Sequence, residues 1–108
     1  MFNITSTGPA AIRRSVWLGF YLKMDNVTRN GRPVWQKIGA GERYLFYNDN
    51  NYWVLDQKYS INSIGYITTV DQHLERPPST GWKFHNGSMV VEDPRLKAQE
   101  SKIHNTCL

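Results

Sequence analysis

The chain has 108 residues, of which 40% are hydrophobic, 13% aromatic and 20% charged. This composition excludes an intrinsically disordered protein, and the length accommodates one domain with one hydrophobic core. A single cysteine, Cys107, excludes a domain held together by intrachain disulfides or by a cysteine-rich zinc site. Hydrophobic packing must therefore stabilise the fold, and the Trp, Tyr and Phe residues supply large side chains for it.

Short runs of aromatic and β-branched residues recur between clusters of Gly, Asn, Asp and Pro, whereas helical periodicity is weak. This pattern predicts an all-β domain of about six to eight antiparallel strands, either a small sandwich or a partly closed barrel. The expected strands, in chain order, are 16–23, 33–38, 43–47, 52–55, 64–70, 82–85 and 89–91.

Three turn signals separate these strands. Asn30-Gly31 and Asn86-Gly87 combine residues that tolerate positive φ, and each predicts a tight turn. The first of them ends an expected exposed loop over residues 25–31. Asn48-Asp49-Asn50-Asn51 lies between two aromatic runs and predicts the loop of a further hairpin.

The two ends of the chain have weaker patterns than residues 15–97, which we take as a single β-rich module. Residues 1–14 are expected to be a flexible segment or an edge strand over Asn3-Ile4-Thr5. Asp93-Pro94 has the residue types of a helix N-cap and first helical position. This pair predicts a short helix or a tail that includes residues 98–108.

The formal net charge is +4, and residues 1–41 contain a single acid, Asp25, beside their basic residues. The chain has no long run of like charges, so a solvated basic surface is the simpler interpretation and an anionic partner the alternative.

The start of the chain lacks the segments of a secretory signal peptide, and its longest nonpolar run, Val16–Leu22, is too short to span a membrane. Three Asn-X-Ser/Thr sequons, at Asn3, Asn26 and Asn86, point instead to an extracellular protein. The compartment stays open; one cysteine and no signal peptide favour the cytoplasm, with no membrane partner.

Motifs of catalysis are missing from the sequence, which has no G-x-S-x-G elbow, phosphate-binding glycine loop or nucleotide-binding fingerprint. The histidines His73, His85 and His104 are too widely spaced for a metal site, so neither a metal nor another cofactor is expected. An acid/base site around Asp71, His73 and Glu75 is the remaining enzymatic alternative. We therefore expect a protein that is not an enzyme.

Aromatic and basic residues alternate in the first half of the chain, which suits several kinds of ligand. The first interpretation is a protein partner, contacted by aromatic side chains within a polar rim and attracted by Arg29 and Arg32. The second is a sugar stacked on a ring, and the third is single-stranded nucleic acid. The candidate binding residues are Arg29, Arg32, Trp35, Tyr44, Asn50 and Tyr52.

A series of short motifs follows a fixed order from about residue 15 to residue 97. They are Gly19-Phe20-Tyr21, Asn30-Gly31-Arg32-Pro33-Val34-Trp35, Tyr44-Leu45-Phe46-Tyr47, Tyr52-Trp53-Val54-Leu55, Gly65-Tyr66-Ile67, Pro77-Pro78-Ser79-Thr80-Gly81-Trp82 and Asp93-Pro94-Arg95-Leu96. Together they resemble an uncharacterised β-rich repeat module of large multidomain eukaryotic proteins.

The resemblance implies a binding or scaffolding unit with no catalytic activity. The shared residues are mostly those that a fold requires. Gly19 and Gly65 suit close approach of the backbone, and Trp53 and Trp82 suit anchors of the core. We therefore expect a non-enzymatic module that mediates protein–protein interaction.

Overall fold

A computed structural model describes residues 1–39, 42–59 and 65–101 of the chain. Within them lie nine strands, one short α-helix and one 3-10 helix. Their bounds are β1 (Phe2–Thr5), α1 (Ala10–Arg13), η1 (Ser15–Trp17), β2 (Gly19–Arg29), β3 (Arg32–Lys37), β4 (Tyr44–Tyr47), β5 (Trp53–Asp56), β6 (Ile67–Thr69), β7 (Trp82–His85), β8 (Val90–Glu92) and β9 (Lys97–Glu100). The prediction of an all-β domain is confirmed. Ile64, expected in a strand, and His104 and Cys107 lie outside the described residues.

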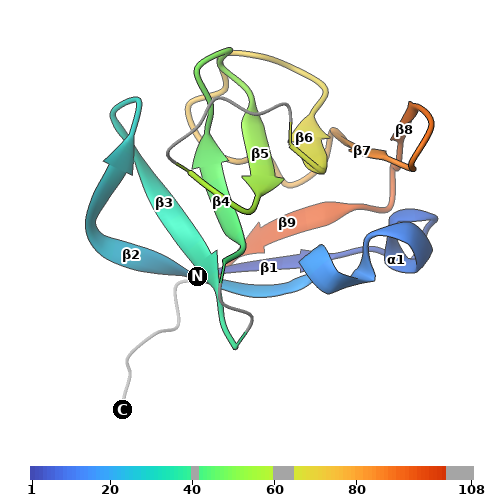
Figure 1. Ribbon diagram of the computed structural model, residues 1–108, viewed down its shortest axis with the longest axis horizontal. Helices are drawn as coiled ribbons and strands as arrows, with labels where there is room; N and C mark the ends of the chain where they lie inside the picture. Colours follow the sequence, from blue (N-terminus) through green and yellow to red (C-terminus); the bar gives the residue numbers. More distant parts are fainter. Residues whose placement is uncertain (40–41, 60–64, 102–108) are drawn as a thin grey trace.

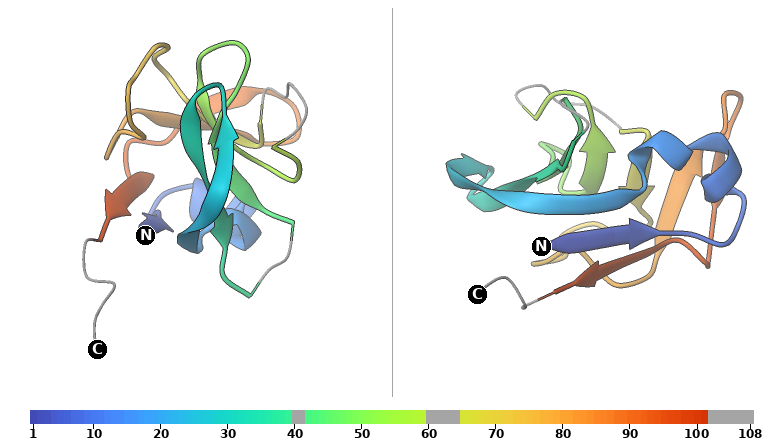
Figure 2. Two further views of the ribbon diagram at one scale, coloured as in Figure 1. Left: turned by 90° about the vertical axis from the view of Figure 1, so that its left-hand side faces the viewer. Right: turned by 90° about the horizontal axis from the view of Figure 1, so that it is seen from below.

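The strands form one antiparallel sheet with the spatial order β8-β7-β6-β5-β4-β3-β2-β1-β9. Strands β1 to β8 are therefore neighbours in chain order, and β9 returns to pair with β1. The sheet curls around one of its faces into a half-barrel (Figure 1). Figure 2 shows the same curvature from two further directions. Of the two expected architectures, the partly closed barrel is the one observed.

The predicted asparagine–glycine turns join strands as expected. Asn30 and Gly31, with φ of 53° and 77°, connect β2 to β3, and positive φ at both positions suits the right-handed twist of a hairpin. Gly87, with φ of 106°, lies in the turn between β7 and β8. There the Asn86 side-chain oxygen accepts hydrogen bonds from two following backbone N–H groups.

The inner face of the curled sheet holds the main core. Alternate residues of the strands point to it, and the resulting cluster includes the predicted anchors Trp53 and Trp82, which are 1% and 2% exposed. The buried members are Phe2, Ile4, Ala10, Trp17, Tyr21, Trp35, Leu45, Tyr47, Trp53, Leu55, Ile67, Trp82, Phe84, Leu96 and Ala98.

The outer face holds a second, smaller cluster formed by the intervening residues of β3, β4 and β5. Val34, Phe46 and Val54 are fully buried there, although they point away from the main core. Partly buried side chains cover them: Met24, Val27, Tyr44, Tyr52 and Tyr59. The central strands are therefore covered on both faces.

The C-terminal segment forms a strand where a helix was the alternative to a tail. The Asp93 side chain accepts a hydrogen bond from the Arg95 N–H at 2.9 Å, and Leu96 N–H donates to the Asp93 carbonyl at 3.0 Å. These bonds close a turn, after which β9 pairs with β1 over four residue pairs. The predicted helix is therefore wrong for residues 97–100, because pairing with a distant strand outweighs the local N-cap signal.

Asp93 also fixes the N-terminal segment to this turn. Its carboxylate accepts hydrogen bonds from the Ser6 hydroxyl at 2.7 Å and from the Ala10 N–H at 3.1 Å. Burial by itself raises the pKa of Asp93, but the hydrogen bonds from Ser6, Ala10 and Arg95 and the charge of Arg95 lower it below its ordinary value. The contact joins the two ends of the described chain.

Two further expectations need correction. Strand β1 is interior, between β2 and β9, so residues 2–5 are not an edge strand. Strand β2 begins at Gly19 and continues to Arg29 through most of the expected loop. A register shift between Lys23 and Thr28 interrupts its pairing with β3, and Asn26 has φ of 59° there. The bulge accommodates residues of weak strand propensity inside a long strand.

Candidate functional site

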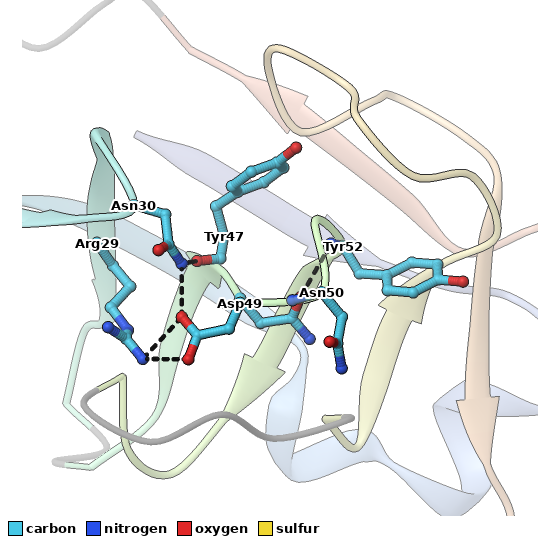
Figure 3. Close-up of polar contacts among 7 residues, drawn as sticks. Arg29, Asn30, Tyr47, Asp49, Asn50 and Tyr52 are labelled. Atoms are coloured by element: carbon cyan, nitrogen blue, oxygen red, sulfur yellow. Dashed lines mark hydrogen bonds and ion pairs between the residues drawn. The ribbon is translucent and has the colours of Figure 1, made fainter.

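The tips of the β2–β3 and β4–β5 hairpins are joined by a polar network (Figure 3). Arg29 forms an ion pair with Asp49, with 3.0 Å between Nη2 and Oδ1. The Asn30 side-chain amide donates to the Tyr47 carbonyl at 2.9 Å and to the Asp49 carboxylate at 3.0 Å. The two tips therefore form one surface, in which the charge of Arg29 already has a partner.

Arg32 is also engaged within the domain. Its guanidinium lies 4.0 Å from the centroid of the Tyr47 ring, and its Nε donates to the Glu75 carbonyl at 3.3 Å. Such stacking positions an arginine firmly. Arg29 and Arg32 were expected to attract an acidic partner. In the structure, both guanidinium groups already contact other residues of the domain.

Trp35 lies in the core, with only 5% of its surface exposed. Its ring packs edge-on against Phe2 at 5.0 Å and against Trp53 at 6.0 Å between centroids. The alternation of β3 sends Trp35 to the inner face and Val34 to the outer face. Of the three aromatic candidates, Trp35 is therefore buried and unavailable as a surface anchor, whereas Tyr44 and Tyr52 are partly exposed.

Tyr44 packs against Tyr59 on the outer face, with 4.8 Å between the ring centroids. Burial raises the pKa of Tyr44, and the neighbouring Tyr59 and Glu42 raise it further. The phenol therefore stays neutral, and the ring acts as part of the outer cluster.

Asn50 and Tyr52 lie together in the β4–β5 loop. The side-chain oxygen of the buried Asn48 accepts hydrogen bonds from the N–H groups of both residues, at 3.0 and 2.9 Å. The loop backbone is thereby fixed. Figure 3 shows the Tyr52 ring extending away from the Arg29–Asp49 pair.

Beside Tyr52 is a hollow of about 250 Å³, which we call the Tyr52 hollow. Its lining residues are Asn48, Asn50, Tyr52, Gly65, Thr68, Lys83, His85 and Val90. Arg32 and Trp35 instead line a different groove of about 520 Å³. The six candidate residues therefore do not converge on one site, and only Asn50 and Tyr52 share the hollow.

A further surface was not among the predicted sites. Phe20, Leu22 and Ile38 are 49%, 51% and 56% exposed, and we call them the outer apolar patch. The Ile38 N–H donates to the Phe20 carbonyl at 2.9 Å, which places these residues on adjacent chain segments. The sequence signal was the alternation around Tyr21: when Tyr21 enters the core, Phe20 and Leu22 must point outward.

The residues of the enzymatic alternative lie on the surface. Asp71, His73 and Glu75 are all exposed in the connection between β6 and β7. Among the residues that the structure describes, no three His, Cys, Asp or Glu side chains gather in a way that holds a metal ion. Neither helix in the described ranges is long and apolar enough to cross a membrane.

Comparison of the chain with models of protein families, with curated proteins and with solved structures finds no match. The resemblance to a eukaryotic repeat module therefore stays a prediction.

Proposed function

We propose that this domain is a non-enzymatic module that binds another protein through the outer apolar patch. The observation that carries the proposal is the exposure of three large apolar side chains: Phe20 and Leu22 on β2, and Ile38 directly after β3, whose N–H bonds to the Phe20 carbonyl. Grouped apolar side chains on a folded domain characterise protein interaction surfaces, whereas isolated ones are common everywhere.

The surroundings of the patch have the composition of a protein interface. Leu22, Met24 and Ile38 line a groove of about 520 Å³, and its other lining residues include the polar Lys23, Asp25 and Gln36. An apolar centre with a polar rim lets a partner displace water from the centre while the rim stays solvated. The patch also contains an aromatic ring, which suits an anchor in a partner's pocket.

The main core does not need these side chains. Phe20 and Leu22 are separated from it by the sheet, and the core is filled by the inward residues of the same strands, including Tyr21 at 0% exposure. Their large side chains therefore contribute little to burial in the isolated domain. Binding of a partner would bury the exposed half of both side chains and remove their apolar surface from water.

The experiment compares proteins captured by three forms of the immobilised full chain: the wild type, a Phe20→Ser/Leu22→Ser double variant and a Met89→Ser control. Met89 is 61% exposed but lies in the β7–β8 turn, outside the patch. We expect a set of proteins retained by the wild type and control and reduced at least tenfold by the double variant. Equal capture by all three forms would contradict the proposal.

The same preparations separate the two alternative functions. On a glycan array, a sugar signal that is indifferent to the double variant would favour a lectin. With single-stranded oligonucleotides, a nucleic-acid binder loses affinity by orders of magnitude between about 50 and 200 mM salt. Either result, without patch-dependent capture of a protein, would replace the proposal.

A further inference from the structure

The Tyr52 hollow is separate from the outer apolar patch and has a different chemistry. The β4–β5 loop contributes Asn50 and Tyr52, β6 contributes Thr68, and β7 contributes Lys83 and His85. All of its polar side chains have at least one hydrogen-bond donor in their ordinary states, and none of its eight lining residues is Asp or Glu. Such a lining favours a ligand that accepts hydrogen bonds.

Lys83 gives the hollow a positive charge. The described residues provide no ion-pair partner for its ammonium group, which lies 5.8 Å from the centroid of the Tyr52 ring. Glu92 is opposite Lys83 in the β7–β8 pairing, but it is exposed and does not line the hollow. A half-buried cation beside a hollow without acids suits a carboxylate.

His85 adds a second donor. Its Nδ1 accepts a hydrogen bond from the Gly87 N–H at 3.1 Å, so the proton of the neutral ring is on Nε2. The ring thus offers its Nε2–H group as a donor. The bond to the turn also restrains the orientation of the ring.

The remaining lining matches a sugar ring. Tyr52 contributes an aromatic side chain to the lining, next to the Lys83 ammonium, and a pyranose has an apolar face that packs against such a ring. The Asn50 amide and the Thr68 hydroxyl both donate and accept, as do sugar hydroxyls. The volume of about 250 Å³ lies just below the usual range of ligand pockets, so the ligand is no larger than a monosaccharide.

We propose that the Tyr52 hollow binds an acidic sugar residue of the hexuronic acid class. Its carboxylate pairs with Lys83, its ring packs against Tyr52, and its hydroxyls exchange hydrogen bonds with Asn50 and Thr68. This inference does not depend on the proposed protein-binding function, since the two surfaces share no residue.

The test is an NMR titration of the ¹⁵N-labelled full chain with four probes. Two are the methyl glycosides of glucuronic and galacturonic acid. Methyl glucoside keeps a ring but lacks the carboxylate, and acetate has the carboxylate alone. We expect saturable shifts of the amides of residues 48–52 and 83–85 with at least one uronide, and at least tenfold weaker binding of the glucoside and of acetate.

Two variants assign the carboxylate contact. Lys83→Gln is expected to reduce uronide affinity about tenfold, to the level of the glucoside, while the amide spectrum shows an intact fold. Lys97→Gln, an exposed lysine on β9 outside the hollow, is the matched control and is expected to change nothing.

Three results would overturn the proposal. They are the absence of saturable shifts near the hollow, equal affinity for uronide and acetate, and unchanged uronide binding by Lys83→Gln. The second would identify a site for anions in general, as would be expected if an acidic peptide were the ligand.

Discussion

The inner and outer faces of the sheet are made by the same strands, yet they cover their apolar side chains to different extents. On the inner face, Trp53 and Tyr21 are at most 1% exposed and belong to one continuous cluster. On the outer face, Phe46 is buried in a small cluster, whereas Phe20 and Leu22 are about half exposed. Alternation along a strand therefore places a buried core residue beside an exposed apolar one, because neighbouring residues point to opposite faces.

The largest expected effect comes from removing a ring of the inner face. Trp53→Ala deletes a side chain that packs against Trp35 and Tyr47 and donates from its indole to the Leu74 carbonyl at 2.9 Å. We expect a loss of about 3 to 5 kcal/mol in the free energy of unfolding, measured by urea denaturation. A loss below about 1 kcal/mol would show that the inner cluster does not hold the fold.

Substitution of Gly65 tests how closely the outer face of β5 is packed. A Cβ at Gly65 would lie 2.8 Å from the Val54 Cβ and 3.0 Å from the Ile67 carbonyl, at φ of +81°. Gly81 has a similar φ of +87°, but nothing lies within 4 Å of its would-be Cβ. In both Ala variants, the positive φ is unfavourable for a residue with a Cβ and costs about 1 kcal/mol of stability.

Only Gly65→Ala adds the collision, so we expect it to cost about 1 to 3 kcal/mol more than Gly81→Ala. Thermal or urea unfolding of both variants measures the difference. Equal losses would mean that the backbone at Gly65 moves away from Val54 without cost.

Asp93 connects the ends of the chain, and its contribution depends on pH. Because its pKa is lowered in the folded state, the carboxylate stabilises the fold above the unfolded pKa of about 3.9, and this is lost as pH falls through the folded value. We expect Asp93→Asn to cost about 2 kcal/mol at pH 7. The difference in free energy of unfolding between variant and wild type should become smaller below about pH 4. Urea unfolding at a series of pH values measures this difference. A difference that does not change with pH would mean that the loss comes from altered packing or hydrogen bonding and not from the charge of the carboxylate.

The smallest effect is expected at the hairpin tips. Asp49→Asn removes the ion pair with Arg29, which is partly exposed, and should cost about 0.5 kcal/mol. This loss should vanish at about 1 M salt, where exposed charges are screened. The control is Asp25→Asn, which removes a different exposed carboxylate, located in β2. A salt-independent loss would instead indicate that the hydrogen bond from Asn30 is the important contact.

Local sequence signals predicted much of the strand framework. Asn30-Gly31 and Asn86-Gly87 produced hairpins because their turn chemistry is encoded within two residues. The pairing of β9 with β1 was missed because it joins residues nearly a hundred positions apart, such as Phe2 and Glu100. In β9 only Ala98 is buried, so its own alternation is a weak signal.

The site was predictable only in part, for a similar reason. Asn50 was expected at the surface because it belongs to a predicted turn, and Tyr52 because it starts the strand after that turn; both line the Tyr52 hollow. Lys83 and Val90 join them only through the order of strands in the sheet, which no local pattern reveals. The burial of Trp35 was not predictable because the sequence does not tell which face of β3 is turned to the core.

The division between the two faces is tested most directly by adjacent residues of β2. Tyr21 is fully buried and donates its hydroxyl to the Trp17 carbonyl at 2.7 Å, whereas Leu22 is half exposed in the outer apolar patch. Urea unfolding of Tyr21→Ala and Leu22→Ala should give losses of about 3 to 5 kcal/mol for the first and at most about 0.5 kcal/mol for the second. Comparable losses would contradict the account, because Leu22 would then be part of the structural core and not free for a partner.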